Sequence, residues 1–183
     1  NPFFAFNKDH LSTLATNKGI GILASIESAS AFCDENISSK EGFKNLETII
    51  NTVKNVFYIS FTHHTENRFG GGNYSKAGLK EDGKALINYI SGRKIAIDFS
   101  HTSDALAYDI LNYLSKENLE IPILASHSNY RSIFDHPRNL PNDIAKEIIN
   151  KNGVIGVNFL RAFVNNEDPE THDGQSNRLN ANQ

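Results

Sequence analysis

The sequence predicts an α/β fold with a parallel sheet, a partial (β/α) barrel of about five units from an eight-unit, TIM-like barrel. Five short apolar runs rich in Ile and Val alternate with amphipathic helical segments. The runs lack the apolar–polar alternation of a half-exposed sheet, which indicates strands that are covered on both faces. Strands and helices that alternate in this way form βαβ units. A full barrel takes about 250 residues, so the 183 residues here supply only part of one.

Each element is expected from its own pattern. Strands are predicted at residues 20–26, 56–62 and 154–160, and in KIAIDFSH (94–101) and IPILASHS (121–128). Helices are predicted at residues 40–55, 79–91 and 103–117, because apolar side chains recur there at the spacing of one helix face. A fourth helix has Pro141 in its first turn and ends at Gly153. Residues 1–17 are compatible with a short helix, with Leu11 and Leu14 facing a core.

The composition bounds the domain organisation. Residues 1–164 are expected to form one partial-barrel domain, and the polar residues 165–183 a disordered tail. The net charge of −3 is spread along the chain and leaves no basic surface for nucleic acid. No apolar run reaches the 18 or so residues of a membrane span. Cys33 is the only cysteine, which excludes an internal disulfide and a cysteine-based zinc cluster.

The start of the chain bears on localisation. Asn1 opens the sequence, and the chain has no methionine, which indicates a processed or truncated product. No secretory signal is visible, so the cytoplasm is the expected compartment.

Polar side chains follow the predicted strands. Because the carboxyl ends of parallel strands meet at one rim, these side chains are expected to lie together. Glutamate and histidine suit Zn²⁺, and a carboxylate that bridges two ions can clamp one water for metal-assisted hydrolysis. A plainer interpretation is a set of satisfied or solvated polar groups at strand ends. The residues are Glu27, His63 (or His64), His101, His127 and Asn158.

Arg138 lies a short way beyond His127 and could hold a carboxylate through its bidentate guanidinium. On its own, it is more typical of a surface arginine that caps or solvates a loop.

More specific motifs surround these positions. They are ASIES at Glu27, ISFTH at His63, IDFSHTS at His101, ILASHSNYRSIFDHPRNLPND from His127 past Arg138, and GVNF at Asn158. In this order they resemble the membrane dipeptidase (renal dipeptidase) family of zinc peptidases, from about residue 20 to residue 164. The segments around His101 and His127, with the Arg-Asn-x-Pro that follows, are together the most specific part.

The resemblance implies a (β/α)₈ barrel that holds two zinc ions and cleaves dipeptides to amino acids. Glu27 would bridge the ions, and His101 and His127 would complete the protein ligands of one of them. His63 would bind the substrate carbonyl or the oxyanion, with His64 as its alternative, because the spacing to the following asparagine is longer here than in the family. Arg138 would bind the free carboxylate of the dipeptide, and Asn158 is placed with these substrate-binding residues.

The sequence also departs from the family pattern. The family's first strand carries a His-x-Asp that binds the other zinc, and no His-x-Asp occurs in this sequence. The glycine-rich last strand with its catalytic aspartate is not found either, so no residue is assigned with certainty as catalytic. One zinc shell of the two is recognisable, and the chain is expected to be an internal fragment with weak or no activity.

Three functions follow from these observations. The first is a zinc-dependent dipeptidase, represented here by an incomplete chain. The second is a non-catalytic remnant that binds zinc or a peptide. The third is an assembly subunit that pairs through exposed sheet edges, for example as a homo-oligomer.

Overall fold

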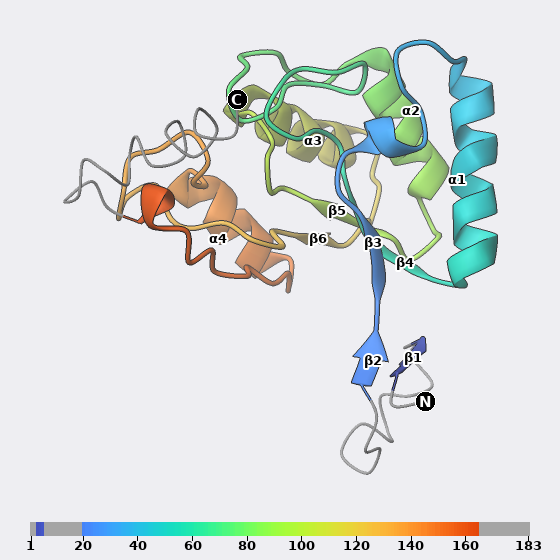
Figure 1. Cartoon of the computed structure of the whole chain (residues 1–183). Coiled ribbons are helices and arrows are strands. Elements are labelled where there is room, and N and C mark those ends of the chain that lie inside the picture. The colour runs from blue at the N-terminus through green and yellow to red at the C-terminus, as the bar shows by residue number, and fades with distance from the viewer. Residues whose placement is uncertain (1–2, 6–19, 165–183) are drawn as a thin grey trace, which may run out of the picture.

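The computed structural model describes residues 3–5 and 20–164. A parallel sheet of four strands in the order β3-β4-β5-β6 forms its centre (Figure 1). The strands are short and lie side by side in chain order: β3 (Ala24–Ile26), β4 (Val56–Ser60), β5 (Ala96–Asp98) and β6 (Ile123–Leu124). A parallel sheet in sequential order is the arrangement expected of consecutive βα units. The α/β class with a parallel sheet is therefore confirmed.

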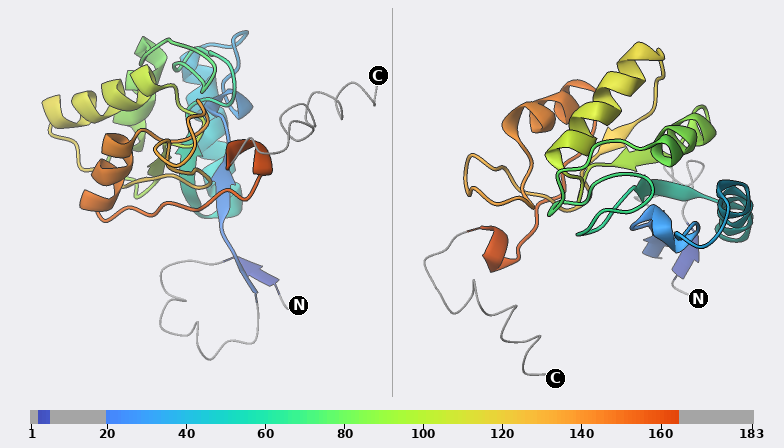
Figure 2. Two further views of the ribbon diagram at one scale, coloured as in Figure 1. Left: turned by 90° about the vertical axis from the view of Figure 1, so that its left-hand side faces the viewer. Right: turned by 90° about the horizontal axis from the view of Figure 1, so that it is seen from above.

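Four helices cover the sheet, and Figure 2 shows them following one another in chain order around it. They are α1 (Ser39–Val53), α2 (Glu81–Ile90), α3 (Asp104–Lys116) and α4 (Asn142–Asn150). Two of them begin at a serine cap, since the Ser38 and Ser103 hydroxyls accept hydrogen bonds from backbone N–H groups at 3.2 and 3.0 Å. Short 3₁₀ turns lie at Ala29–Ala31 and Arg161–Phe163.

The core lies between the sheet and the helices. Strand residues such as Ile59 and Ile97 are fully buried there, against helix residues such as Leu106 and Ile110. Each buried aliphatic side chain of this size contributes about 1.5–3 kcal/mol to folding relative to an exposed one. The core thus fixes the strand ends in register, with Ser60 paired to Asp98 and Asp98 to Leu124.

The first predicted strand, at residues 20–26, is interrupted at Leu23. Its first part is β2 (Ile20–Ile22), which pairs in parallel with β1 (Phe3–Ala5), and only its second part, β3, joins the main sheet. The helix predicted over residues 1–17 is therefore wrong at Phe3–Ala5, and its remainder lies outside the described residues.

The fifth predicted strand, at residues 154–160, is wrong as a regular strand. One parallel bridge, Ala125 to Ile155, continues the sheet beyond β6, and the Gly156 N–H donates to the Ala125 carbonyl at 2.8 Å. The chain then leaves the sheet, and Val157 and Phe159 are 60% and 88% exposed.

The ends of α4 also differ from expectation. Pro141 is the residue before the helix and lies outside its first turn. At the other end, the helix stops at Asn150, before the expected Gly153, and Asn152 takes the left-handed conformation (φ 58°). Gly153 has a different role, because a Cβ there would lie 2.3 Å from the Ile123 carbonyl oxygen.

No helix in residues 20–164 has both the length and the apolar character needed to cross a membrane. The tail predicted at residues 165–183 lies outside the described part of the chain.

Candidate metal centre

The predicted site residues lie just beyond the carboxyl ends of four parallel strands. Glu27 directly follows β3, and His63 lies in the loop after β4. His101 follows β5 and His127 follows β6, each three residues beyond its strand. Because the strands end in register, residues far apart in the sequence come to one rim of the sheet.

Three side-chain atoms meet at this rim. Glu27 Oε1 lies 3.2 Å from His101 Nε2 and 3.2 Å from His127 Nε2. The two Nε2 atoms are 3.0 Å apart. We call Glu27, His101 and His127 the rim triad. Ligands of a tetrahedral zinc ion lie roughly 3.3 Å apart, so an ion fits the triad after a shift of a few tenths of an ångström.

The remaining ring nitrogen of each histidine bonds to an oxygen atom. His101 Nδ1 lies 3.1 Å from Asn73 Oδ1, and an amide oxygen only accepts. His127 Nδ1 lies 2.6 Å from the Ser126 hydroxyl, which donates its proton to Asp98 at 2.6 Å. Both Nδ1 atoms therefore carry the proton, and both Nε2 atoms present a lone pair to the triad.

Both imidazoles are held neutral. Burial, followed by the positive charge of Arg138, lowers the pKa of His101 to about 2. Burial and Arg138 also lower the pKa of His127. Two lone pairs and a carboxylate oxygen thus face one another with no proton between them, an arrangement that attracts a cation.

The backbone around the triad adopts unusual conformations. His101 has φ 68°, in the left-handed region, and Ser28, directly after Glu27, has φ 73°. The Thr62 hydroxyl donates to the His101 carbonyl at 3.1 Å and helps to hold this conformation. Non-glycine residues in this region often lie at functional sites, where the surrounding structure over-determines the strain.

Comparison with known proteins decides the family. A model of the membrane dipeptidase family (peptidase family M19) matches residues 3–180. The chain belongs to this family.

Individual proteins are also similar to this chain. Dipeptidase verJ of Clonostachys rogersoniana is 30% identical over an alignment of 145 residues, and the match covers 73% of this chain and 36% of the relative. A metallopeptidase of Rhodobacter sphaeroides, liganded with a phosphinate mimic of L-Ala-D-Ala, superposes with a TM-score of 0.70 at 22% identity, over 88% of this chain and 45% of that one. The probable dipeptidase PvdM of Pseudomonas aeruginosa superposes with a TM-score of 0.72 at 20% identity. The match covers 94% of this chain and 43% of PvdM. At these identities the structures show the shared fold. The chain spans about a third of the length of its curated relatives.

The other residues expected from the family pattern differ in their surroundings. His63 is open, and its Nε2 lies 3.8 Å from Glu27 Oε1. Its ring centroid is 4.1 Å from that of His101. His64 instead turns toward Asn73 Oδ1, 3.2 Å from its Nδ1, and packs on Tyr74. Of the two histidines, His63 thus has the more open ring beside the triad, and the choice between them as the substrate-binding residue stays a prediction.

Arg138 is buried and only 3% exposed, so it is not the surface arginine of the alternative interpretation. Its Nη1 donates to the Ser128 hydroxyl at 2.9 Å, and its Nη2 donates to the His127 carbonyl at 2.7 Å. Its Nε has no partner among the described residues. A buried donor without a partner costs about 1–3 kcal/mol, which an incoming anion could recover.

Asn158 does not join the histidines through any hydrogen bond in the described structure. Its side-chain oxygen accepts from the Leu160 N–H at 2.8 Å, and its backbone bonds with Asn129. A substrate-binding role for Asn158 stays a prediction, as do the ligand roles of the triad.

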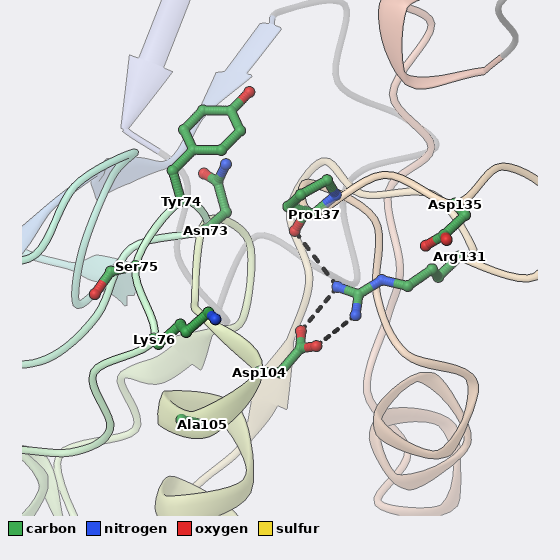
Figure 3. A pocket seen from close by; sticks show the side chains of 9 residues that line it. All are labelled: Asn73, Tyr74, Ser75, Lys76, Asp104, Ala105, Arg131, Asp135 and Pro137. Carbon is green, nitrogen blue, oxygen red and sulfur yellow. Dashed lines mark hydrogen bonds and ion pairs between the residues drawn. The ribbon is translucent and has the colours of Figure 1, made fainter.

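A pocket of about 480 Å³ adjoins the centre. Figure 3 shows its wall, where Arg131 pairs with Asp104 in a bidentate ion pair. The pocket shares Asn73 with the surroundings of His101, but neither the triad nor Arg138 lines it. The lining residues are Asn73, Tyr74, Ser75, Lys76, Asp104, Ala105, Arg131, Asp135 and Pro137.

Three residues that hydrogen-bond to the triad histidines, directly or through one another, were not predicted from the sequence: Asn73, Asp98 and Ser126. Asn73 and Asp98 are buried, and Ser126 is partly buried. One signal was available, because Asp98 is a charged residue inside the apolar run IAIDF. Asn73 lies in a loop without periodicity, and Ser126 is a small polar residue at the end of the predicted strand 121–128, where it has no distinguishing signal.

The low pKa of His101 predicts a pH effect on stability. In the unfolded chain His101 takes up a proton near pH 6.5, whereas in the folded protein it does so only near pH 2. The contribution to stability is therefore complete above about pH 6.5 and is lost as the pH falls below it. The slope from this residue is at most about 1.4 kcal/mol per pH unit, the limit for one proton.

Urea unfolding of the zinc-free chain between pH 7 and pH 5 measures this slope. His101→Asn is the matched variant, since asparagine tolerates a positive φ and does not titrate. A shallower slope is expected in the variant, and equal slopes in both proteins would contradict the prediction.

Proposed function

We propose that this chain carries the zinc-binding and dipeptide-binding part of a dipeptidase site. In this proposal Glu27, His101 and His127 hold one zinc ion. His63 meets the substrate carbonyl or the oxyanion, and Arg138 receives the free carboxylate of the dipeptide. Membership of the membrane dipeptidase family supports it, as does a relative that binds a phosphinate mimic of a dipeptide.

The observation that carries the proposal is the set of three facing electron pairs. Glu27 Oε1 and the two Nε2 atoms lie 3.0–3.2 Å apart, and the protons of both imidazoles are engaged elsewhere. Mutual repulsion at this distance is relieved when a cation lies between the atoms. Nitrogen and oxygen donors in this number favour zinc with an open position for substrate or water.

The bound ion would supply Lewis-acid chemistry, polarising the scissile carbonyl and making water a stronger nucleophile. The protein's own groups then select and orient the dipeptide. His63, whose pKa is lowered by partial burial and by His64, can donate a hydrogen bond to the carbonyl oxygen. Arg138, a permanent cation even though burial lowers its pKa to about 10, attracts the carboxylate.

Calorimetric titration of the full chain with Zn²⁺ tests the proposal. We expect one ion per chain, because the other described cluster, formed by His63, His64 and His101, shares His101 with the triad. Dipeptide hydrolysis is measured on the same sample, and weak or no turnover is expected from a single metal shell. No zinc binding would refute the proposed function, and rapid turnover that a chelator abolishes would refute the single-shell expectation.

Replacing Arg138 by lysine tests the carboxylate site. We expect Ala-Ala to bind the zinc-loaded variant about tenfold or more weakly, because lysine cannot form a bidentate pair. Binding is measured by calorimetry. The matched ligand is Ala-Ala amide, which lacks the carboxylate and should bind both proteins equally. If both ligands weaken by the same factor, Arg138 does not read the carboxylate.

Pairing of two chains through the sheet edge is the second candidate function. Beyond β6, Val154, Val157 and Phe159 expose 69%, 60% and 88% of their surface. Apolar side chains beside an open sheet edge favour association with another chain. Light scattering over a range of concentrations should show a dimer that Phe159→Lys weakens, whereas a monomer at all concentrations would exclude this function.

A further inference from the structure

Asp98 is a fully buried carboxylate that accepts four hydrogen bonds. Its Oδ1 accepts from the backbone N–H groups of Ser100 and Ser126, both at 2.9 Å. Its Oδ2 accepts from the hydroxyls of Ser60 at 2.7 Å and Ser126 at 2.6 Å. No lysine or arginine of the described chain forms an ion pair with it. Burying a charge is costly, so a carboxylate here calls for a reason beyond packing.

The direction of the hydrogen bonds supplies that reason. An ionised carboxylate can only accept, so the Ser126 hydroxyl proton points to Asp98. The second contact of this hydroxyl is His127 Nδ1 at 2.6 Å, and there it must accept. The Ser100 hydroxyl is a poorer target for the Ser126 proton, since it is neutral and 3.4 Å away. The proton between Ser126 and His127 therefore belongs to Nδ1.

We propose that Asp98 is a positioning residue that, through Ser126, fixes His127 as the Nδ1–H tautomer and so keeps the Nε2 lone pair directed at the rim triad. This inference rests on the proposed zinc site. Asp98 does not touch the triad itself, and His127 is the only triad member reached by this chain of hydrogen bonds among the described residues.

Asp98→Asn reverses the chain without changing its shape. The asparagine oxygen must take the Oδ1 position, because two backbone N–H groups point there. The NH₂ group then replaces Oδ2 and donates one hydrogen to Ser60 and one to Ser126. The Ser126 hydroxyl is now free to donate to His127 Nδ1, which moves the imidazole proton to Nε2. In that tautomer Nε2 has no lone pair for an ion.

The experiment combines two measurements on the full chain. Nitrogen-15 NMR of the zinc-free protein assigns the His127 tautomer, and competition with a chelator gives the zinc affinity. We expect Nδ1–H in the wild type and Nε2–H in Asp98→Asn, with zinc affinity lowered by about 10- to 100-fold. Ser60→Ala is the matched control, since it removes a bond to the same Oδ2 atom but lies off the path to His127. It should keep the wild-type tautomer and affinity.

Ser126→Ala gives a second test should Asp98→Asn not fold. It removes the acceptor of the Nδ1 proton, so we expect a mixture of tautomers and a smaller loss of affinity. An Nδ1–H tautomer with wild-type affinity in either folded variant would overturn the inference. If the wild type itself binds no zinc, the proposed function fails, and the tautomers of the zinc-free proteins still decide the role of Asp98.

Discussion

Replacing His127 by alanine should lower the zinc affinity of the chain by more than about 100-fold. Loss of a residue that only orients a ligand typically costs 10- to 100-fold, and removal of the ligand itself costs more. His127 Nε2 lies 3.2 Å from Glu27 Oε1 and 3.0 Å from His101 Nε2, so its loss opens one side of the triad. Competition with a chromogenic chelator at neutral pH measures the effect.

His136→Asn is the control for this variant. His136 belongs to the same loop region, and its Nδ1 accepts from the Arg138 backbone N–H at 3.0 Å, an interaction that an asparagine oxygen can replace. It does not belong to the triad, so its replacement should leave zinc affinity unchanged. Equal affinities for the wild type and His127→Ala would remove His127 from the metal centre.

Replacing Gly72 by alanine should destabilise the chain by about 3 kcal/mol and weaken zinc binding as well. A Cβ on Gly72 would lie 2.4 Å from the His63 carbonyl oxygen and 2.5 Å from backbone atoms of His64 and Thr65. All three are backbone atoms, so no flexible side chain can move aside, and the cost is at the upper end of overpacking in a core. Relief requires a shift of the loop that carries both histidines and Asn73.

Gly92→Ala separates this effect from the general cost of replacing a glycine. Gly92 lies two residues beyond α2 with φ 73°, and a Cβ there would meet nothing within 4 Å. Only the left-handed conformation is then penalised, by about 1–2 kcal/mol, and zinc binding should not change. Urea unfolding and zinc titration of both variants provide the comparison. A Gly72→Ala protein as stable as Gly92→Ala would show that the loop is looser than the structure indicates.

Much of the fold could be predicted because it depends on local patterns. Helix α3 has buried Leu106, Ile110 and Leu114 at helical spacing and begins at the serine that the pattern indicates. Strand β4 begins at the residue expected from VFYISFT. In these segments, local propensity and tertiary packing favour the same structure, so the sequence alone is sufficient.

Where the prediction was wrong, contacts between distant residues decided the structure. The run VIGVNFL resembles a strand, but only Ile155 pairs with the sheet, and Phe159 packs against nothing that would bury it. Residues 20–26 form two strands in different sheets because β2 pairs with β1, and no local sequence pattern predicts this pairing. Strand propensity is realised only when a neighbouring strand is available.

The residues of the candidate site also fall into two groups, those that the sequence predicts and those that it does not. Glu27, His101 and His127 could be proposed because each directly follows an apolar run, and the motifs around them resemble a known family. Asn73 and Ser126 could not be proposed, because their role depends on the ring nitrogen of the histidine to which each is hydrogen-bonded. The direction of a hydrogen bond is a property of the three-dimensional arrangement, and no spacing in the chain encodes it.

The rim triad draws one residue from the end of each of three strands, β3, β5 and β6. An ion there is therefore a cross-link between parts of the chain that are distant in sequence, and it is absent from the unfolded state. Folding is then coupled to the free zinc concentration, and a hundredfold excess over the dissociation constant adds about 2.7 kcal/mol to the free energy of unfolding. In a zinc-poor medium the same chain would unfold at a lower temperature. Its stability would therefore depend on the free zinc concentration around it.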